Sequence, residues 1–261
     1  MDLLLDDHVI LVTGATSGIG RSTALELAGE GARVVAGGRD EERLTLLRSE
    51  LDSIGADHLV VPGDLTTVEG LAAFTAAPLE RHERIDGLVA TVGSTPLGDF
   101  DAVDDEVWQL AFTGKLLASV RAVRAVLPHL RRRGSGRILV VAGNTAHAPD
   151  PAMLTSGAMN AALVNLVAAT AQHIAREGLG INCLSPGPTN TARYAGMLAA
   201  LMRREGVTEE AAADTIRSAI PAGRVAEPDE VAKLAALLVS PVSAHINGTN
   251  VVMDGAQTWI S

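Results

Sequence analysis

A glycine-rich turn follows the first apolar run of the chain, and its residue types suit the binding of a phosphate. The run Val9–Thr13 leads into three closely spaced glycines, and a stretch with helical spacing, Ile19–Glu30, follows at once. Glycines permit a tight turn, and the backbone N–H groups of such a turn lie at the positive end of the next helix. A plain strand-to-helix turn also uses glycine, so the surrounding pattern has to support the site. The glycines predicted to seat a pyrophosphate are Gly14, Gly18 and Gly20, and Thr16, Ser17 and Ile19 complete the predicted cofactor-binding turn.

Stretches of strand length and helix length alternate along the whole chain and must position this turn. The predicted strands are Val9–Thr13, Arg33–Gly37, His58–Val61, Gly87–Ala90, Arg137–Ala142, Ile181–Leu184 and Asn250–Met253. The predicted helices are Ile19–Glu30, Glu41–Ile54, Val68–Glu80, Asp105–Arg133, Ala152–Glu177 and Pro228–Val239. This alternation is typical of a doubly wound α/β fold, here a seven-stranded parallel sheet with helices on both faces. We therefore predict a single Rossmann domain over residues 1–261, with ligands at the carboxyl ends of the strands.

Residues 189–222 interrupt the alternation and are predicted to form a helical insertion beside the strand ends. The insertion contains Met197 and Met202, followed by the charged segment Arg203–Glu210. A flexible Met-rich surface suits variable apolar ligands, which favours a lid over a substrate. Packed helices without lid motion explain the pattern equally well.

Composition excludes several classes of partner. The formal net charge is −10 and aromatic residues make up only 2% of the chain, which argues against nucleic acid or an anionic membrane surface. No uninterrupted apolar run reaches the roughly 18 residues of a spanning helix, and the N-terminus carries Asp6 and Asp7 rather than a basic segment. Cys183 is the single cysteine, which fits a reducing compartment. We expect a soluble, cytoplasmic protein that acts on a small molecule and has no metal site.

Five ordered motifs resemble those of the short-chain dehydrogenase/reductase family, over essentially the whole chain. The motifs are Thr13–Gly20, similar to the TGxxxGxG cofactor loop, and then Asp64–Thr66, Ile181–Thr189, Gly223–Ala232 and Ile246–Gly255. The resemblance implies a nicotinamide cofactor, with Asp64 at its adenine and the Pro186-Gly187 segment beside its nicotinamide. The residues that the resemblance adds to the predicted cofactor site are Asp64, Leu65, Gly93, Pro186, Gly187 and Thr189.

The end of the second predicted strand bears on which nicotinamide cofactor binds. NAD-specific relatives have a carboxylate there, which accepts hydrogen bonds from the ribose hydroxyls and would repel a 2′-phosphate. This chain has Gly37, Gly38 and Arg39 instead, and the guanidinium of Arg39 offers a fork of donors to a phosphate. We predict NADP(H). A solvated surface Arg39 with NAD(H) bound is the alternative.

The catalytic residues that the resemblance implies are missing. In the family a Tyr hydroxyl exchanges the proton, a Lys four residues later lowers the pKa of that Tyr, a Ser polarises the carbonyl, and an Asn on an earlier helix orders a water. The aligned positions here are Ser156 for Tyr, Asn160 for Lys, Gly143 for Ser and Lys115 for Asn. The only tyrosine, Tyr194, lies in the insertion and has no Lys four residues after it, so sliding the alignment does not restore the tetrad.

An exchange between two helices is our hypothesis for the rebuilt site. Lys115 lies on an apolar part of its predicted helix, where burial lowers the pKa of an ammonium. Because the family has Asn and then Lys, and this chain has Lys and then Asn, the Lys115 ammonium is predicted to reach the space of the usual Lys with Asn160 as its polar partner. Ser156 shares a helix face with Asn160 and would orient substrate or water. The alternative is that Lys115 extends to solvent and Ser156 only packs.

A histidine is a further candidate for proton transfer. His147 follows the fifth predicted strand, near where the substrate should lie, and a histidine titrates in the useful pH range. The alternative is a surface residue, as is common for a single histidine in a loop.

The predicted helix Ala152–Glu177 bears on assembly. It is apolar nearly all round, and a sheet covers only one side of a helix. Relatives pair this helix and the preceding long one between subunits, so the resemblance implies a homodimer or a homotetramer.

Three functions remain open from the sequence. The first is an NADP(H)-dependent oxidoreductase with a rebuilt proton-transfer site, acting on a carbonyl or an activated C=C. The second is a protein that retains the cofactor without redox turnover, such as a sensor or partner subunit. The third is a non-redox lyase or cyclase that reuses the pocket. The intact cofactor loop favours the first, whereas the missing tetrad favours the second.

Overall fold

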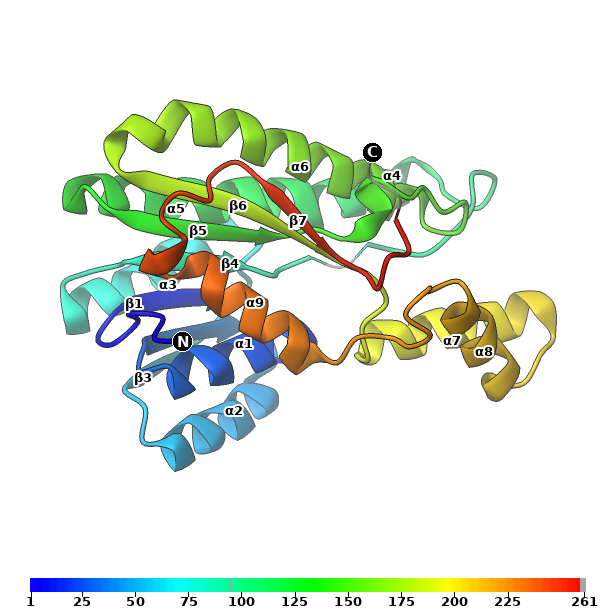
Figure 1. Ribbon diagram of the computed structural model, residues 1–261, viewed down its shortest axis with the longest axis horizontal. Helices are drawn as coiled ribbons and strands as arrows, with labels where there is room; N and C mark the ends of the chain where they lie inside the picture. Colours follow the sequence, from blue (N-terminus) through cyan, green and yellow to red (C-terminus); the bar gives the residue numbers. More distant parts are fainter. Residues whose placement is uncertain (94, 259–261) are drawn as a thin grey trace.

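A seven-stranded parallel sheet forms the centre of the protein (Figure 1). The computed structural model describes residues 1–93 and 95–258. The strands are β1 (Val9–Thr13), β2 (Arg33–Gly38), β3 (His58–Pro62), β4 (Gly87–Ala90), β5 (Gly136–Val141), β6 (Leu179–Pro186) and β7 (Asn250–Met253). Their order is β3-β2-β1-β4-β5-β6-β7, with every neighbouring pair parallel. The predicted fold is confirmed, and the order reverses between β1 and β4, where such sheets open a ligand crevice.

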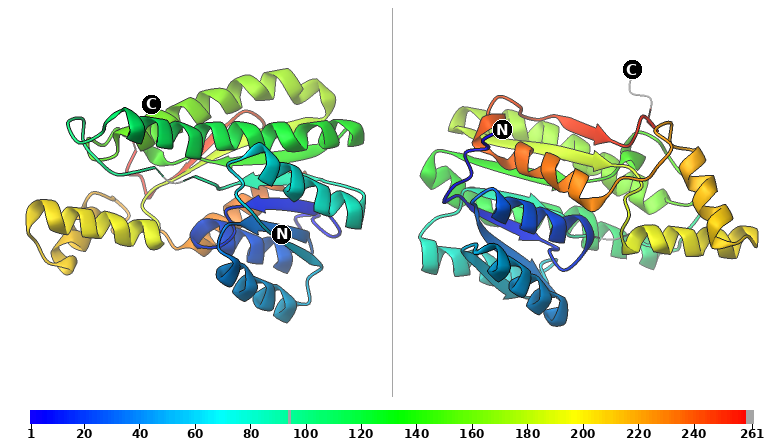
Figure 2. Two further views of the ribbon diagram at one scale, coloured as in Figure 1. Left: turned by 180° about the vertical axis from the view of Figure 1, so that it is seen from behind. Right: turned by 60° about the horizontal axis from the view of Figure 1, so that its bottom comes forward.

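Helices cover both faces of the sheet (Figure 2). The helices are α1 (Gly18–Gly29), α2 (Glu41–Ile54), α3 (Val68–His82), α4 (Asp105–Ala111), α5 (Ala118–Arg133), α6 (Leu154–Ile174), α7 (Ala192–Glu205), α8 (Glu209–Ser218) and α9 (Pro228–Val239). Helices α1, α2 and α9 contribute to the core on one face, and α3, α5 and α6 to the core on the other. Helices α7 and α8 lie within the predicted insertion and project beyond the sheet at its carboxyl edge (Figure 1).

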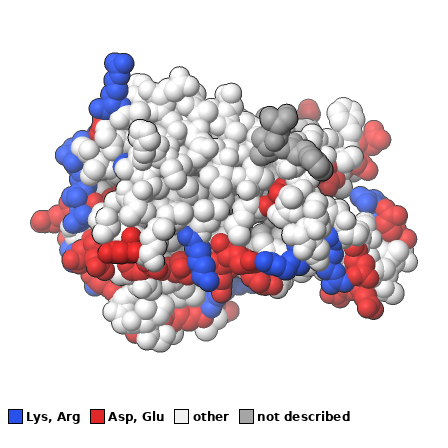
Figure 3. Space-filling view, viewed as in Figure 1, with Lys and Arg blue, Asp and Glu red and all other residues white. Residues whose placement is uncertain are grey.

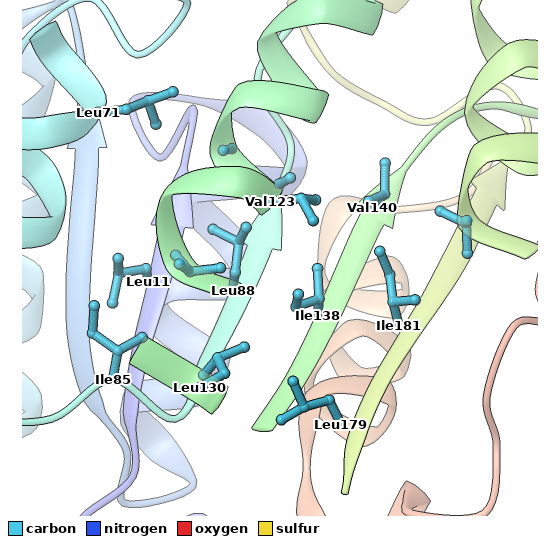
Figure 4. Close-up of a cluster of buried hydrophobic side chains, with 14 of the residues drawn as sticks. Leu11, Leu71, Ile85, Leu88, Val123, Leu130, Ile138, Val140, Leu179 and Ile181 are labelled. Atoms are coloured by element: carbon cyan, nitrogen blue, oxygen red, sulfur yellow. The ribbon is translucent and has the colours of Figure 1, made fainter. Parts of the chain in front are cut away.

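Alternation along the buried strands divides the apolar core in two. Val9 and Leu11 of β1 pack with the α3, α5 and α6 side, whereas Ile10 and Val12 pack with the α1, α2 and α9 side. Figure 4 shows part of the first cluster, where Leu11, Leu88 and Ile138 from neighbouring strands face α5. Successive side chains of a strand point to opposite faces, so a strand covered on both sides must be apolar throughout. Burial of each such side chain contributes about 1.5–3 kcal/mol.

The long helix predicted over Asp105–Arg133 is not a uniform α-helix. A π-helical turn, η1 (Phe112–Leu117), separates α4 from α5. Gly114 lies within this turn, and glycine weakens the local preference for the α-helix. Single π-turns inside longer helices are frequent at functional sites. Lys115 stands in this turn.

Helix α6 is long and strongly apolar. Together with the short turn after it, over Leu154–Glu177, it meets the length and composition of a membrane span, although polar residues interrupt its apolar runs. Its residues Leu163, Val167 and Ile174 are fully buried and belong to the core cluster on the α5 side of the sheet. We therefore interpret α6 as a sheet-covering helix.

Helix α3 begins at a side-chain cap whose removal is a measurable test of the fold. The hydroxyl of Thr67 accepts a hydrogen bond from the Gly70 N–H at 3.0 Å and donates to the Asp64 carbonyl at 2.8 Å. Loss of such a cap typically costs about 1 kcal/mol. Thr67→Ala will therefore lower the free energy of unfolding in urea by about that amount. Thr45→Ala is the matched control, because the Thr45 hydroxyl only bonds back to the Glu41 carbonyl inside α2; an equal loss in both variants would contradict a specific cap.

Candidate active site

A cleft of about 660 Å³ lies at the carboxyl ends of β1, β2, β4, β5 and β6. Its walls include the turn before α1, the loops after β2 and β3, the π-turn, the start of α6 and the first residues of α7. All residues of the predicted cofactor site line this cleft: Gly14, Thr16, Ser17, Gly18, Ile19, Gly20, Arg39, Asp64, Leu65, Gly93, Pro186, Gly187 and Thr189. Three of the four predicted catalytic residues line it as well, namely Lys115, Ser156 and Asn160.

The turn between β1 and α1 has a backbone that fits a pyrophosphate. Gly14 and Gly18 adopt φ values of +69° and +51°, which side chains disfavour. A Cβ on Gly20 would overlap the Gly14 carbonyl oxygen and lie 2.6 Å from Thr91 Oγ1. The glycines therefore let the chain fold tightly at the N-terminus of α1, where backbone N–H groups and the helix dipole favour an anion.

The end of β2 has no room for a side chain at the position where NAD-specific relatives carry an acid. A Cβ on Gly38 would lie 2.5 Å from the methyl group of Thr16. Arg39 follows and lines the same part of the cleft. The carboxylate of Asp64, across this end, accepts hydrogen bonds from the Thr66 N–H at 3.0 Å and hydroxyl at 2.8 Å, and these lower the Asp64 pKa.

Lys115 brings an ammonium group into the other end of the cleft. The side chain is partly buried, and its Nζ donates a hydrogen bond to the Ala142 carbonyl oxygen at 3.3 Å. The pKa of Lys115 is lowered to about 8, chiefly by burial and also by the positive charge of Arg193. The backbone of Gly93 permits this arrangement, because a Cβ there would lie 2.8 Å from the Lys115 Cα.

Ser156 is buried and belongs to a hydrogen-bonded cluster of polar side chains. Its hydroxyl shares a hydrogen bond with the hydroxyl of Thr95, and it accepts one from Arg193 Nη2 at 2.8 Å. Arg193 Nη1 also donates to the Thr95 carbonyl oxygen at 3.1 Å. The cluster therefore connects the loop after β4, the start of α6 and the start of α7.

Asn160 does not make the predicted contact with Lys115. Its Nδ2 donates instead to Thr145 Oγ1 at 2.8 Å, while Lys115 bonds to Ala142, and no hydrogen bond between the two appears among the described residues. The Asn160 amide fills the space beside Gly143, where a Cβ would lie 2.8 Å from Nδ2. Its Oδ1 is buried and has no hydrogen-bond partner in the described part of the chain. This acceptor is therefore available to a bound molecule or a water in the cleft.

His147 lies away from the other candidates. It is exposed, is not among the residues that line the cleft, and its Nε2 lies 2.6 Å from Asn250 Nδ2 on β7. The chain turns through a short 3-10 helix, Asn144–Ala146, after β5, and this turn directs residue 147 outward. We therefore leave His147 out of the site.

Arg193 and Thr95 are site residues that the sequence reasoning missed. Arg193 is the first cation after the Pro186-Gly187 segment and stands among small and apolar residues, a weak signal that would have marked it. Nothing in the sequence around Thr95 distinguishes it. Its place in the cleft depends on the hydrogen bond to Ser156, which is 61 residues away along the chain.

The packing of Asn160 against Gly143 predicts the effect of restoring a serine. Gly143 has an extended backbone, φ 172° and ψ 154°, which serine adopts without strain. In Gly143→Ser the new Cβ must displace the Asn160 amide, and we expect a loss of about 1–2 kcal/mol in unfolding free energy, as is usual for an overpacked site. Asn160→Ala in the same chain should recover most of it, as measured by urea unfolding. A serine tolerated without loss beside Asn160 would contradict the described packing.

Comparison with known proteins identifies the family of the chain. The family described as enoyl-(acyl carrier protein) reductase matches residues 14–258. The chain belongs to the short-chain dehydrogenase/reductase family. An uncharacterized oxidoreductase of Bacillus subtilis, YvrD, is 32% identical over 98% of both chains. The NADPH and L-sorbose complex of L-sorbose reductase from Gluconobacter frateurii is 27% identical, with a TM-score of 0.93 over 100% of both chains.

One solved structure of similar fold is described as having an atypical catalytic centre. The NADPH-bound short-chain oxidoreductase from Pseudomonas aeruginosa PAO1 "containing an atypical catalytic center" is 29% identical, with a TM-score of 0.89, over 98% of this chain and 100% of that one. The family resemblance drawn from the motifs is thus confirmed. An altered catalytic centre has also been described on a similar fold.

Proposed function

We propose that this short-chain dehydrogenase/reductase reduces a carbonyl group or an activated C=C of a small molecule, with Lys115 holding the proton for the reaction. The observation that carries the proposal is the Lys115 ammonium inside the cleft, bonded to Ala142 and with a pKa of about 8. A proton donor works best when its pKa lies near the working pH. A lysine in this environment meets that condition, whereas an unperturbed serine hydroxyl does not.

The cofactor is NADP(H), and the residues at the end of β2 fit it. Arg39 offers paired donors to a 2′-phosphate, and a side chain at residue 38 would crowd the methyl group of Thr16. The chemistry that NADPH supplies when bound is a hydride for the substrate carbon. Asn160 Oδ1 supports the same placement, since this buried acceptor has no partner among residues 1–93 and 95–258 and suits a hydroxyl donor such as that of a ribose.

The remaining steps fall to the chain's own residues. As the C=O π bond breaks and a C–H bond forms, the oxygen takes the electron pair and requires a proton. Lys115 Nζ would give that proton to the oxygen and be left as the neutral amine, which regains a proton from solvent through the open cleft. Ser156 would orient the same oxygen by a hydrogen bond from its hydroxyl. The positive charge of Lys115 would also polarise the carbonyl oxygen before the proton is transferred.

The test is NADPH oxidation, followed at 340 nm, with a panel of ketones, aldehydes and α,β-unsaturated carbonyl compounds. Steady oxidation with at least one class supports the proposal. NADPH that binds, as seen by fluorescence, but is not oxidised with any compound would favour a cofactor-retaining sensor or partner subunit instead. Product formed by protein without the cofactor would indicate a lyase or cyclase.

We also propose that the protein assembles as a homodimer or homotetramer through the side that carries α4 to α6. Figure 3 shows few charged side chains over α6, whereas acids and bases gather over the lower part of that view. Large apolar side chains are exposed beside this region, among them Leu110 and Phe112. An exposed apolar surface of this kind indicates an interface.

The single cysteine, Cys183, is buried and unpaired, which fits the proposed cytoplasmic location.

A further inference from the structure

Arg193 occupies the substrate side of the cleft. It stands in the first turn of α7, directly after the loop that follows β6, and its side chain lines the cleft. Its guanidinium donates to the Ser156 hydroxyl at 2.8 Å and to the Thr95 carbonyl oxygen at 3.1 Å. Ser156 is the position that aligns with the family's proton-donating residue. The guanidinium is therefore within reach of the group that would be reduced.

The charges that line the cleft are divided between its two ends. The lining acids, Asp40 and Asp64, follow β2 and β3 at the end assigned to the adenosine part of the cofactor. At the opposite end stand Lys115 and Arg193, close enough that the charge of Arg193 disfavours the protonated form of Lys115. Two neighbouring cations in a partly enclosed space attract an anion, because an anion between them relieves their mutual repulsion.

The phosphate groups of the cofactor are assigned to other parts of the cleft. The pyrophosphate fits the glycine turn at the N-terminus of α1, and the 2′-phosphate fits Arg39. An anion bound between Lys115 and Arg193 would then belong to the substrate. Arg193 is exposed within the open cleft, so an entering molecule can reach it.

We propose that Arg193 binds a carboxylate of the substrate, and that the substrates are small oxo acids. This inference rests on the proposed reductase function and names its substrate class. A carboxylate matches the planar fork of a guanidinium and accepts stronger, charge-assisted hydrogen bonds than the neutral oxygens of Ser156 and Thr95. With a carboxylate held there, the carbonyl of the same molecule would lie in the part of the cleft lined by Ser156 and Lys115.

Matched substrate pairs test the inference by kinetics. The probes are 2-oxobutanoate, 3-oxobutanoate and 4-oxopentanoate, each against its methyl ester, which keeps the carbonyl and removes the charge. The wild type should prefer at least one acid over its ester. Arg193→Ala should lower kcat/KM for that acid by roughly 10- to 100-fold, while changing the value for the ester less than about threefold, and Arg193→Lys should recover part of the loss.

Arg203→Ala is the control, because Arg203 lies on the same helix but is exposed near its end. It should leave every rate unchanged. A wild-type preference for the esters, or an equal loss for acid and ester in Arg193→Ala, would overturn the inference.

A binding measurement separates failure of this inference from failure of the reductase proposal. The thermal unfolding midpoint of the NADPH complex is measured with each acid and each ester at equal ionic strength. An upward shift with an acid, absent with its ester and absent in Arg193→Ala, supports the carboxylate site even if no NADPH is oxidised; only the reductase proposal would then fail. If no shift depends on both the carboxylate and Arg193, the carboxylate site is rejected, whatever carbonyl compounds the enzyme reduces.

Discussion

Lys115→Met will lower kcat for carbonyl reduction by roughly 100-fold to 1,000-fold, in the range expected for loss of a general acid. Methionine keeps the length and apolar stem of lysine and removes the ammonium that lies 3.3 Å from the Ala142 oxygen. NADPH should bind with nearly unchanged affinity, because the residues predicted to contact its phosphates, the glycine turn and Arg39, do not include Lys115. The measurement is steady-state NADPH oxidation beside a fluorescence titration of NADPH.

The pH dependence of the wild type should report the same group. The pKa of Lys115 is lowered to about 8, chiefly by burial. The ammonium is therefore present below pH 8 and lost as the pH rises through that value. Reduction at saturating substrate should fall by tenfold for each pH unit above about 8, since a one-unit change alters the protonated fraction tenfold. This alkaline limb should be absent from the residual rate of Lys115→Met.

The sequence offers a clean control and a direct titration. The chain contains two lysines, and the other, Lys233, is exposed on α9. Lys233→Met should leave kcat and its pH profile unchanged. Reductive ¹³C-methylation gives NMR signals from both lysines, and that of Lys115 should titrate near pH 8. Full activity in Lys115→Met, or a Lys115 signal that does not titrate near pH 8, would remove lysine from the mechanism.

Cofactor preference should invert when an acid is introduced at the end of β2. Gly38→Asp together with Arg39→Leu supplies a carboxylate for ribose hydroxyls and removes the guanidinium predicted to hold the 2′-phosphate. Loss of a charge-assisted contact and gain of a like-charge repulsion should shift the ratio of kcat/KM values for NADPH and NADH by roughly 100-fold or more toward NADH.

The close approach of Thr16 makes this switch conditional on a third change. A Cβ at residue 38 lies 2.5 Å from the Thr16 methyl group, so the aspartate crowds the glycine turn unless that methyl is removed. Thr16→Ser should therefore be needed for tight NADH binding in the double variant. Arg43→Ala is the matched control, because Arg43 is exposed on α2 and pairs with Asp40. Unchanged selectivity after removal of Arg39 would contradict its assignment to the phosphate.

Much of the fold could be predicted because its signals are local. Strands buried on both faces read as short apolar runs, and each helix between them carries its own period and its own ends. The glycine turn is local too, since a positive φ at Gly14 and Gly18 depends on the residue type at that position. The glycines of that turn and Arg39 could therefore be named in advance from local pattern, and Asp64 from the family resemblance, and all of them line one cleft.

The chemical end of the cleft required the folded chain. The sequence predicted a pair between Lys115 and Asn160 by analogy with the family. In the structure Asn160 donates to Thr145 and Lys115 to the Ala142 carbonyl oxygen. The reach and direction of the side chains decide such contacts. The sequence reasoning also missed Arg193, which meets Ser156 across 37 residues of sequence. Local pattern thus determined the sheet and the phosphate-binding turn. Only tertiary packing decided which side chains share the substrate space, because those contacts join segments that carry no signal of one another.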